Sequence, residues 1–221
     1  MTEIWLIRHG ETAWNAESRL QGQLDVPLSP KGIAQAFRVA ERLKNSQLAF
    51  DALYTSDLSR ALQTARPIAE NLGLDLWLEP RLREIDVGKL QNKLHEEIKR
   101  EFPDYYRAVS ADPWNTPRPG GESMADVACR VEDFLHELPE GRFIAVAHGG
   151  VIRAALKVVL GLEGLSWRKF HIQNTSITRL TYPEGGALTV GDVGHLETWA
   201  DHLSDDQVAS GGMGQASESS R

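Results

Sequence analysis

The feature that most constrains the fold is an apolar run near the start of the chain that ends abruptly at polar residues. Residues 4–7, Ile-Trp-Leu-Ile, have the length and near-continuous apolarity of a strand buried on both faces, which is typical of the centre of a parallel sheet. Arg8, His9 and Gly10 follow at once. Because open α/β sheets bind ligands at the carboxyl ends of their strands, we expect Arg8 and His9 at a binding site, with Gly10 allowing the backbone to approach the ligand.

The same pattern recurs late in the chain, where the apolar run of residues 142–147 ends at His148, Gly149 and Gly150. Strand and helix patterns alternate between and after the two runs. Further strands are expected at residues 50–55, 74–78, 176–182 and 187–193, and helices at residues 30–43, 58–72, 122–138 and 151–160. This alternation predicts an α/β sandwich on a mainly parallel sheet, to which a hairpin of the last two strands adds an antiparallel element.

Local signals define the ends and faces of two helices. Ser29 fits the N-cap of the first helix and Pro30 its first position. The apolar face of that helix is expected to comprise Ile33, Phe37, Ala40 and Leu43. The next helix is expected to be capped by Ser56 and Asp57, with Arg60 in its first turn, where the helix dipole and the free N–H groups favour anions. The loop of residues 17–28 follows the first strand and is expected to fold over the site.

Composition and charge exclude several classes of function. With 221 residues the chain suits one domain, placed here at residues 1–200, whereas residues 201–221 have few apolar side chains and are expected to form a disordered tail. A net charge of −7 argues against nonspecific binding of nucleic acid. Because Cys129 is the single cysteine, an intramolecular disulfide is excluded. The sequence shows no pattern of a signal peptide or a membrane span. A cytoplasmic protein without a membrane partner is therefore expected.

A candidate catalytic set stands at the expected strand ends and helix starts, and it consists of Arg8, His9, Arg60, Glu84 and His148. Arginines gathered at one place favour an anion, and their planar forks match phosphate oxygens. The set predicts phosphoryl transfer through a covalent phosphohistidine, in which His9 attacks in line and Glu84 gives a proton to the leaving alkoxide and later accepts one from water. Arg8, Arg60 and His148 would hold the equatorial oxygens, so no metal and no cofactor are expected.

Ordered motifs along the chain carry a resemblance to a known family. They are Leu-Ile-Arg-His-Gly-Glu-Thr-Ala-Trp-Asn at residues 6–15, Gln21-Gly22 with Asp25 and residues 27–29, residues 55–61 with 63–65, Arg83-Glu84 with Gly88, residues 119–123, and residues 146–150. Over residues 3–182 the chain resembles the histidine phosphatase superfamily, in its phosphoglycerate mutase-like branch. The resemblance implies a three-layer α/β/α sandwich on a mixed sheet.

The resemblance also implies roles at matching positions. His9 is similar to the phosphorylated histidine of the family, Glu84 to its proton donor, and Arg8, Arg60 and His148 to its phosphate pocket. Further substrate contacts correspond to Asn15, Gln21, Gly22 and the backbone of Gly149. The implied partner is a small phosphorylated metabolite. Family members are monomers, dimers or tetramers, so a homodimer stays open for this chain.

Two departures from the family pattern bear on the branch. Asn92 stands where many members have a glycine. True mutases also carry an adjacent arginine pair after the acid, whereas residues 102–121 contain only Arg107 and Arg118, which are not adjacent. We therefore favour a phosphatase of small phosphomonoesters over a phosphoglycerate mutase. A binding module without activity would be indicated by the loss of His9 or Glu84, and both are present.

Other residues receive structural interpretations. A tight turn at Gly120 and Gly121 and an N-cap at Ser123 explain the surroundings of Glu122 without a role in the site. The remaining histidines, which are His95, His136, His171, His195 and His202, show no metal-ligand spacing. Substrate selectivity is expected to lie in residues 90–118 and in the loop of residues 17–28, which leaves the substrate itself unnamed.

Overall fold

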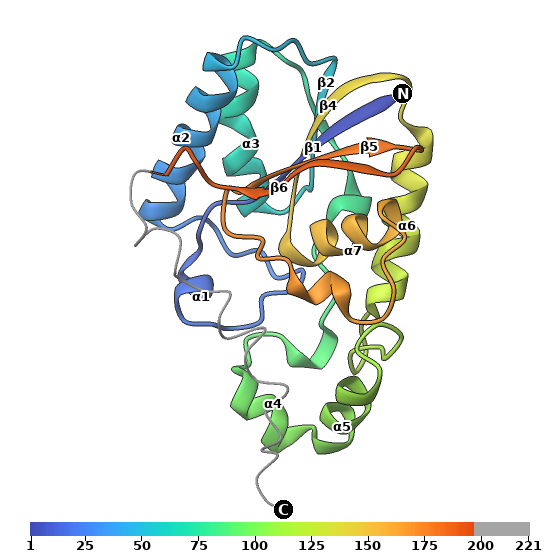
Figure 1. Ribbon diagram of the computed structural model, residues 1–221. Coiled ribbons are helices and arrows are strands. Elements are labelled where there is room, and N and C mark those ends of the chain that lie inside the picture. The colour runs from blue at the N-terminus through green and yellow to red at the C-terminus, as the bar shows by residue number, and fades with distance from the viewer. Residues whose placement is uncertain (197–221) are drawn as a thin grey trace, which may run out of the picture.

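The computed structural model describes residues 1–196, and within them six strands form one twisted sheet (Figure 1). The strands are β1 (Thr2–Arg8), β2 (Ala52–Thr55), β3 (Leu76–Leu78), β4 (Gly141–Ala147), β5 (Ile177–Tyr182) and β6 (Gly186–Asp192). The expected tail at residues 201–221 and the last residues of the expected domain lie outside the described residues. None of the helices within residues 1–196 is long and apolar enough to cross a membrane.

The sheet has the order β3-β2-β4-β1-β5-β6. The pairs β2–β3, β2–β4 and β1–β4 are parallel, whereas β1–β5 and β5–β6 are antiparallel. The prediction of a mixed, mainly parallel sheet with an antiparallel hairpin at its end is therefore confirmed. The N-terminal strand β1 lies inside the sheet, between β4 and β5.

Helices cover both faces of the sheet (Figure 1). The helices α2 (Pro30–Asn45) and α3 (Ser59–Leu72) pack on one face, and α6 (Met124–Glu137) and α7 (Gly149–Val159) pack on the other. Strand β1 contributes to both cores, because Ile4 and Leu6 point into one and Trp5 and Ile7 into the other. This is why its sequence is apolar without alternation, as expected for a strand buried on both faces.

Short elements lie near the carboxyl ends of β1 and β4. They are α1 (Ala13–Ala16), α4 (His95–Glu101) and α5 (Pro103–Ala111), together with 3₁₀ turns at Pro80–Leu82, Gly88–Leu90 and Ser166–Lys169. In Figure 1, α4 and α5 project below the sandwich. Residues 90–107 were expected to be mixed helix and loop, and they contain α4 and the first residues of α5.

The predicted apolar face of α2 is wrong in part. Ile33 and Phe37 are 45% and 56% exposed. The buried face instead comprises Gly32, Gln35, Ala36, Val39, Ala40 and Leu43. Gly32, Ala36 and Ala40, at a spacing of four, give this face a row of small residues at which the helix packs against its neighbours. Periodicity of large side chains therefore selected the wrong stripe.

The predicted cap of α3 is also wrong for Asp57. That carboxylate pairs with the guanidinium of Arg83, while Leu58 occupies the N-cap position without a side-chain hydrogen bond. Asp25 supplies the acceptor for a free N–H of the first turn. Its carboxylate accepts from the backbone N–H of Ser59 at 2.7 Å and from the Ser59 hydroxyl at 2.6 Å. These hydrogen bonds hold the pKa of Asp25 below its usual range. A residue of the loop of residues 17–28 thus caps a helix that begins more than thirty positions later.

Candidate active site

The carboxyl ends of β1 and β4 bring two histidines together. Arg8 is in register with Ala147, and the backbone N–H of His9 donates to the carbonyl of Ala147 at 2.9 Å. The imidazole rings of His9 and His148 then lie with their centroids 5.0 Å apart. Both side chains are buried. The two apolar runs that end in histidine are therefore neighbouring strands whose ends meet.

The tautomer of His9 follows from its contact with Gly10. Its Nδ1 lies 2.7 Å from the carbonyl oxygen of Gly10. A carbonyl only accepts, so Nδ1 carries the proton and Nε2 keeps its lone pair. The carbonyl of His9 accepts from the side chain of Asn174 at 2.9 Å. Asn174 was missed by sequence reasoning, because a single polar residue before a strand gives only a weak signal.

Gly10 allows a close backbone contact within the protein, and its predicted approach to a ligand stays a prediction. A Cβ at this position would lie 2.5 Å from the carbonyl oxygen of Gly32, and a Cβ at Gly32 would lie 2.0 Å from the carbonyl oxygen of Glu11. The two glycines therefore let the segment after β1 cross the first turn of α2 in direct backbone contact. The close approach is to the protein's own helix, which holds the residues next to His9 firmly.

Arg60 connects His148 with the loop of residues 17–28. Its guanidinium donates from Nε to Nδ1 of His148 at 3.3 Å, from Nη1 to the carbonyl of Leu24 at 2.8 Å, and from Nη2 to the carbonyl of Gly22 at 2.6 Å. Nδ1 of His148 accepts, so its Nε2 carries the proton, and this buried Nε2 has no hydrogen-bond partner among the described residues. A protonated Nε2 there is suited to donate to an anionic oxygen.

Burial controls the charges of these groups. It lowers the pKa of Arg60 to about 10, so the guanidinium stays cationic at neutral pH. Burial, and next the charge of Arg60, hold the pKa of both His9 and His148 well below the ordinary value. Both imidazoles are therefore neutral near pH 7, and Nε2 of His9 is available as a nucleophile under those conditions.

Glu84 faces the N-terminus of α7. Its Oε2 accepts from the backbone N–H of Gly150 at 3.3 Å, and its Oε1 accepts from the N–H of Ile85 at 2.9 Å. A Cβ on Gly150 would lie 2.4 Å from Oε1, so only glycine lets the carboxylate come this close to the helix.

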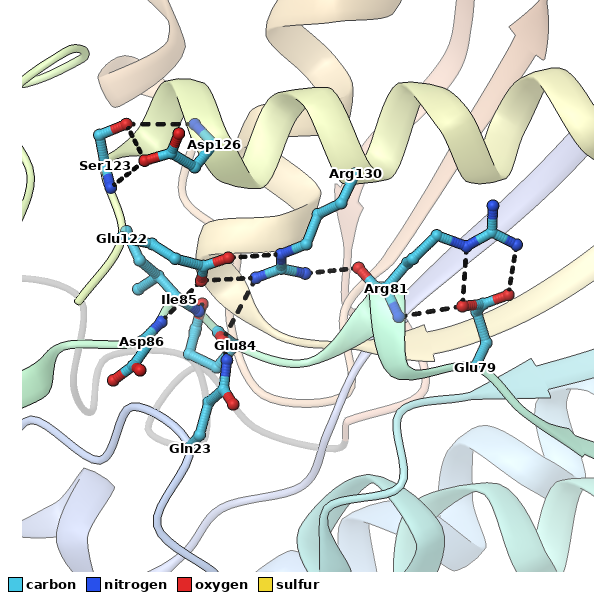
Figure 2. A network of polar contacts seen from close by, with 10 residues as sticks. All are labelled: Gln23, Glu79, Arg81, Glu84, Ile85, Asp86, Glu122, Ser123, Asp126 and Arg130. Atoms are coloured by element: carbon cyan, nitrogen blue, oxygen red, sulfur yellow. Dashed lines mark hydrogen bonds and ion pairs between the residues drawn. The ribbon is translucent and has the colours of Figure 1, made fainter.

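A polar network holds the segment that carries Glu84 (Figure 2). The carbonyl of Glu84 accepts from Nε2 of Gln23 at 3.1 Å and from Nη2 of Arg130 at 3.3 Å. Nε of Arg130 donates to Glu122 at 2.9 Å, and the carboxylate of Glu122 also accepts from the N–H of Asp86 at 2.8 Å. Glu122 therefore braces the Glu84 segment, a connection that the sequence did not reveal. The expected N-cap at Ser123 is confirmed, with a capping box to Asp126.

Two adjoining cavities meet at Glu84. The first has a volume of about 190 Å³, and the predicted residues that line it are His9, Asn15, Gln21, Gly22, Arg60 and Glu84. The second, of about 310 Å³, extends from Glu84 and Gly149 toward α4 and α5. Arg8 is buried beside them, and its Nη1 donates to the carbonyl of Ile172 at 2.6 Å. The structure thus gathers all nine predicted site residues around one place, while their chemical roles stay predictions.

The loop of residues 17–28 lies against this site, as its position in the sequence led us to expect. Leu20, Gln21 and Gly22 line the first cavity, and Arg60 holds the loop by two carbonyls. Within the part of the chain that the structure describes, no group of three or more His, Cys, Asp or Glu side chains is arranged to hold a metal ion. The charged side chains that line the first cavity are Arg19, Arg60 and Glu84.

The buried histidines predict a loss of stability in mild acid. Below the ordinary histidine pKa of 6.5, the unfolded chain binds protons at His9 and His148 that the folded chain does not. The free energy of unfolding should therefore fall with pH, by about 1.4 kcal/mol per pH unit for each histidine. Urea denaturation between about pH 7.5 and about pH 5.5 measures this slope. His148→Gln should reduce it, whereas His136→Ala, at an exposed position, should not. A stability that is constant over this range would contradict the expectation.

Comparison with known proteins identifies the class to which this fold and site belong. The profile of the histidine phosphatase superfamily (branch 1) matches residues 4–191, and the chain belongs to this superfamily. A relative from Enterobacter sp. (strain 638) bears the name probable phosphoglycerate mutase GpmB. It is 39% identical over 208 residues, which cover 89% of this chain and 96% of the relative.

Solved structures give the same class. A His-to-Ala mutant of phosphoserine phosphatase from Entamoeba histolytica, in complex with phosphoserine, is similar at 30% identity and a TM-score of 0.78, covering 89% of this chain and 100% of that one. A mycobacterial glucosyl-3-phosphoglycerate phosphatase in complex with VO3 is similar at 33% identity and a TM-score of 0.76, covering 86% and 99%. These similarities confirm the family and the α/β fold that the motifs predicted.

Proposed function

We propose that this protein is a metal-independent phosphatase that hydrolyses small phosphomonoesters through a phosphohistidine on His9. The observation that carries the proposal is the state of the two facing imidazoles. His9 presents a lone pair at Nε2, and His148 presents a proton at Nε2. Arg60 lines the same cavity, and Arg8 is buried beside it. A nucleophilic nitrogen on His9, a hydrogen-bond donor on His148 and the cationic arginines thus surround a space suited to one phosphoryl group.

The proposed reaction has two steps, phosphorylation of His9 and hydrolysis of the phosphohistidine. Nε2 of His9 forms a bond to phosphorus while the bond from phosphorus to the ester oxygen breaks, and Glu84 gives its proton to the departing oxygen to release the alcohol. Water then attacks the phosphohistidine and passes a proton to the Glu84 carboxylate. The phosphorus–nitrogen bond breaks, inorganic phosphate leaves and His9 is restored. Arg8, Arg60 and His148 bind the phosphoryl oxygens in both steps.

The alternative is a phosphoglycerate mutase that uses the same site, and the name of the Enterobacter relative favours it. The arginines of residues 102–121 argue for the phosphatase. The side chain of Arg107 is 81% exposed and pairs with Asp104 of its own helix, whereas Arg118 lines the second cavity. The two cannot act as a pair on one substrate group. The phosphoserine and glucosyl-3-phosphoglycerate phosphatases among the similar structures also support hydrolysis.

The test is to identify the product in the presence of excess EDTA. We expect steady release of inorganic phosphate from para-nitrophenyl phosphate and from 3-phosphoglycerate, with EDTA leaving the rate unchanged. Formation of 2-phosphoglycerate that requires a bisphosphoglycerate primer, with little free phosphate, would establish the mutase instead. Loss of activity in EDTA that Mg²⁺ restores would contradict a site built on arginines alone.

A further inference from the structure

The second cavity contains hydrogen-bonding capacity that the mechanism above does not use. Its walls are largely apolar, yet they include Arg118, His95 and Trp167. Nη1 of Arg118, Nε2 of His95 and Nε1 of Trp167 are buried and have no hydrogen-bond partner among the described residues. Buried polar groups without partners are costly, so a ligand that pairs with them gains binding energy, and the N–H groups of Arg118 and Trp167 require acceptors.

The charges of the cavity wall select an anion. Arg118, Arg153 and Arg168 line it, and Glu84 is the one acidic residue among its lining residues. Burial lowers the pKa of Arg118, while Tyr105, Glu84 and Glu122 act in the opposite direction. An arginine keeps its charge in a protein, so a buried guanidinium next to apolar walls favours a ligand group that neutralises it.

Arg118 is held at a fixed place relative to Glu84. The backbone N–H of Arg118 donates to the carbonyl of Glu122 at 3.1 Å, and this hydrogen bond closes a turn. The N–H of Glu122 then donates to the carbonyl of Asp86 at 2.8 Å, and the N–H of Lys89 to the carbonyl of Pro119 at 2.9 Å. The turn that carries Arg118 is therefore bonded directly to the segment that follows Glu84. A substrate that places its ester oxygen at Glu84 has its far end at a defined position.

The size of the cavity sets the size of that far end. A cavity of about 150 Å³ accepts benzene, so the volume of about 310 Å³ has room for roughly twice as many atoms. A glycerate group would leave much of this space unfilled. Apolar lining from Leu90, Ile98 and Met124 suits a carbon framework better than a second polar group.

We propose that Arg118 is a specificity residue that binds a carboxylate on the leaving group of the substrate, and that this leaving group has an apolar or aromatic framework larger than a glycerate. The inference rests on the proposed function, because it assigns a binding site to the leaving group of the proposed hydrolysis. The preferred substrates are then phosphate esters of hydroxy acids whose carboxylate is separated from the ester oxygen by such a framework.

Two matched esters test the proposal. Para-carboxyphenyl phosphate and para-carbamoylphenyl phosphate have nearly the same shape, and only the first carries the second charge. We expect the kcat/KM of the wild type to favour the carboxylate by about 10- to 100-fold. In Arg118→Gln the ratio of the two values should fall to about one, and Arg118→Lys should give an intermediate ratio, because lysine retains the charge without the planar fork. The control Arg107→Gln changes an exposed arginine and should keep the wild-type ratio.

A binding measurement separates this inference from the proposed function. Calorimetric titration of His9→Ala with each ester reports affinity without turnover. Tighter binding of the carboxylate, lost on adding Arg118→Gln, would support the subsite even if the wild type released no phosphate, and that result would overturn the phosphatase proposal alone. Equal hydrolysis and equal binding of the two esters would overturn the role of Arg118 and leave the phosphatase proposal standing.

Discussion

Replacing His9 by alanine is expected to lower the kcat for phosphate release by about 10⁴-fold or more. The proposed reaction passes through a bond between phosphorus and Nε2 of His9, and alanine removes the atom that forms this bond. His148 does not substitute, because its Nδ1 accepts from Arg60 and its Nε2 carries a proton. The measurement is steady-state phosphate release from para-nitrophenyl phosphate by purified wild type and variant.

The control for this variant is His136→Ala, which removes an exposed imidazole on α6 and should leave the rate unchanged. Rapid quenching of the wild type during turnover should also trap a phosphoryl group that is stable in alkali and labile in acid, and His9→Ala should give none. A variant that releases phosphate at the wild-type rate would refute the phosphohistidine mechanism.

Replacing Glu84 by glutamine should have the second largest effect, and its size should depend on the leaving group. For an alkyl ester such as β-glycerophosphate, loss of the proton donor should lower kcat by about 10² to 10⁴-fold. Para-nitrophenolate leaves without a proton, so the first step should be nearly as fast as in the wild type. Hydrolysis of the phosphoenzyme still lacks its base, and we therefore expect a burst of nitrophenolate followed by a slow steady state.

Stopped-flow absorbance measures the burst, and its amplitude should approach one equivalent per active site. The matched control is Glu41→Gln, which changes an exposed carboxylate on α2 that lines neither cavity. If Glu84→Gln slowed both esters equally and showed no burst, the carboxylate would serve to position residues and not to transfer protons.

The sequence predicted the centre of the structure well because strong local signals agree there. An uninterrupted apolar run followed by Arg8 and His9 indicates a buried strand and the end at which ligands bind, and His148 repeats the pattern. The register of β1 with β4 then brings the two histidines into contact. Each of these steps needs only strand periodicity and the topology of parallel sheets.

Contacts between distant segments could not be predicted in the same way. Asp25 caps α3, and Glu122 with Arg130 braces the Glu84 segment, across distances along the chain that carry no periodic signal. The exposed Ile33 and Phe37 show a further limit of the pattern, because α2 buries a neighbouring stripe that includes Ala36, Val39 and Leu43. Hydrophobic size predicts burial only where the neighbouring helix leaves room for it.

The place of β1 inside the sheet has a consequence for the order of events during synthesis. This strand is synthesised before both of its neighbours, β4 and β5, which lie much later in the chain. The groups that fix the backbone of His9 come from Ala147 and Asn174. Chains interrupted before these residues contain the histidine without the hydrogen bonds that orient it. The proposed nucleophile is thus oriented only when the domain is nearly complete, and we expect unfinished chains to release no phosphate.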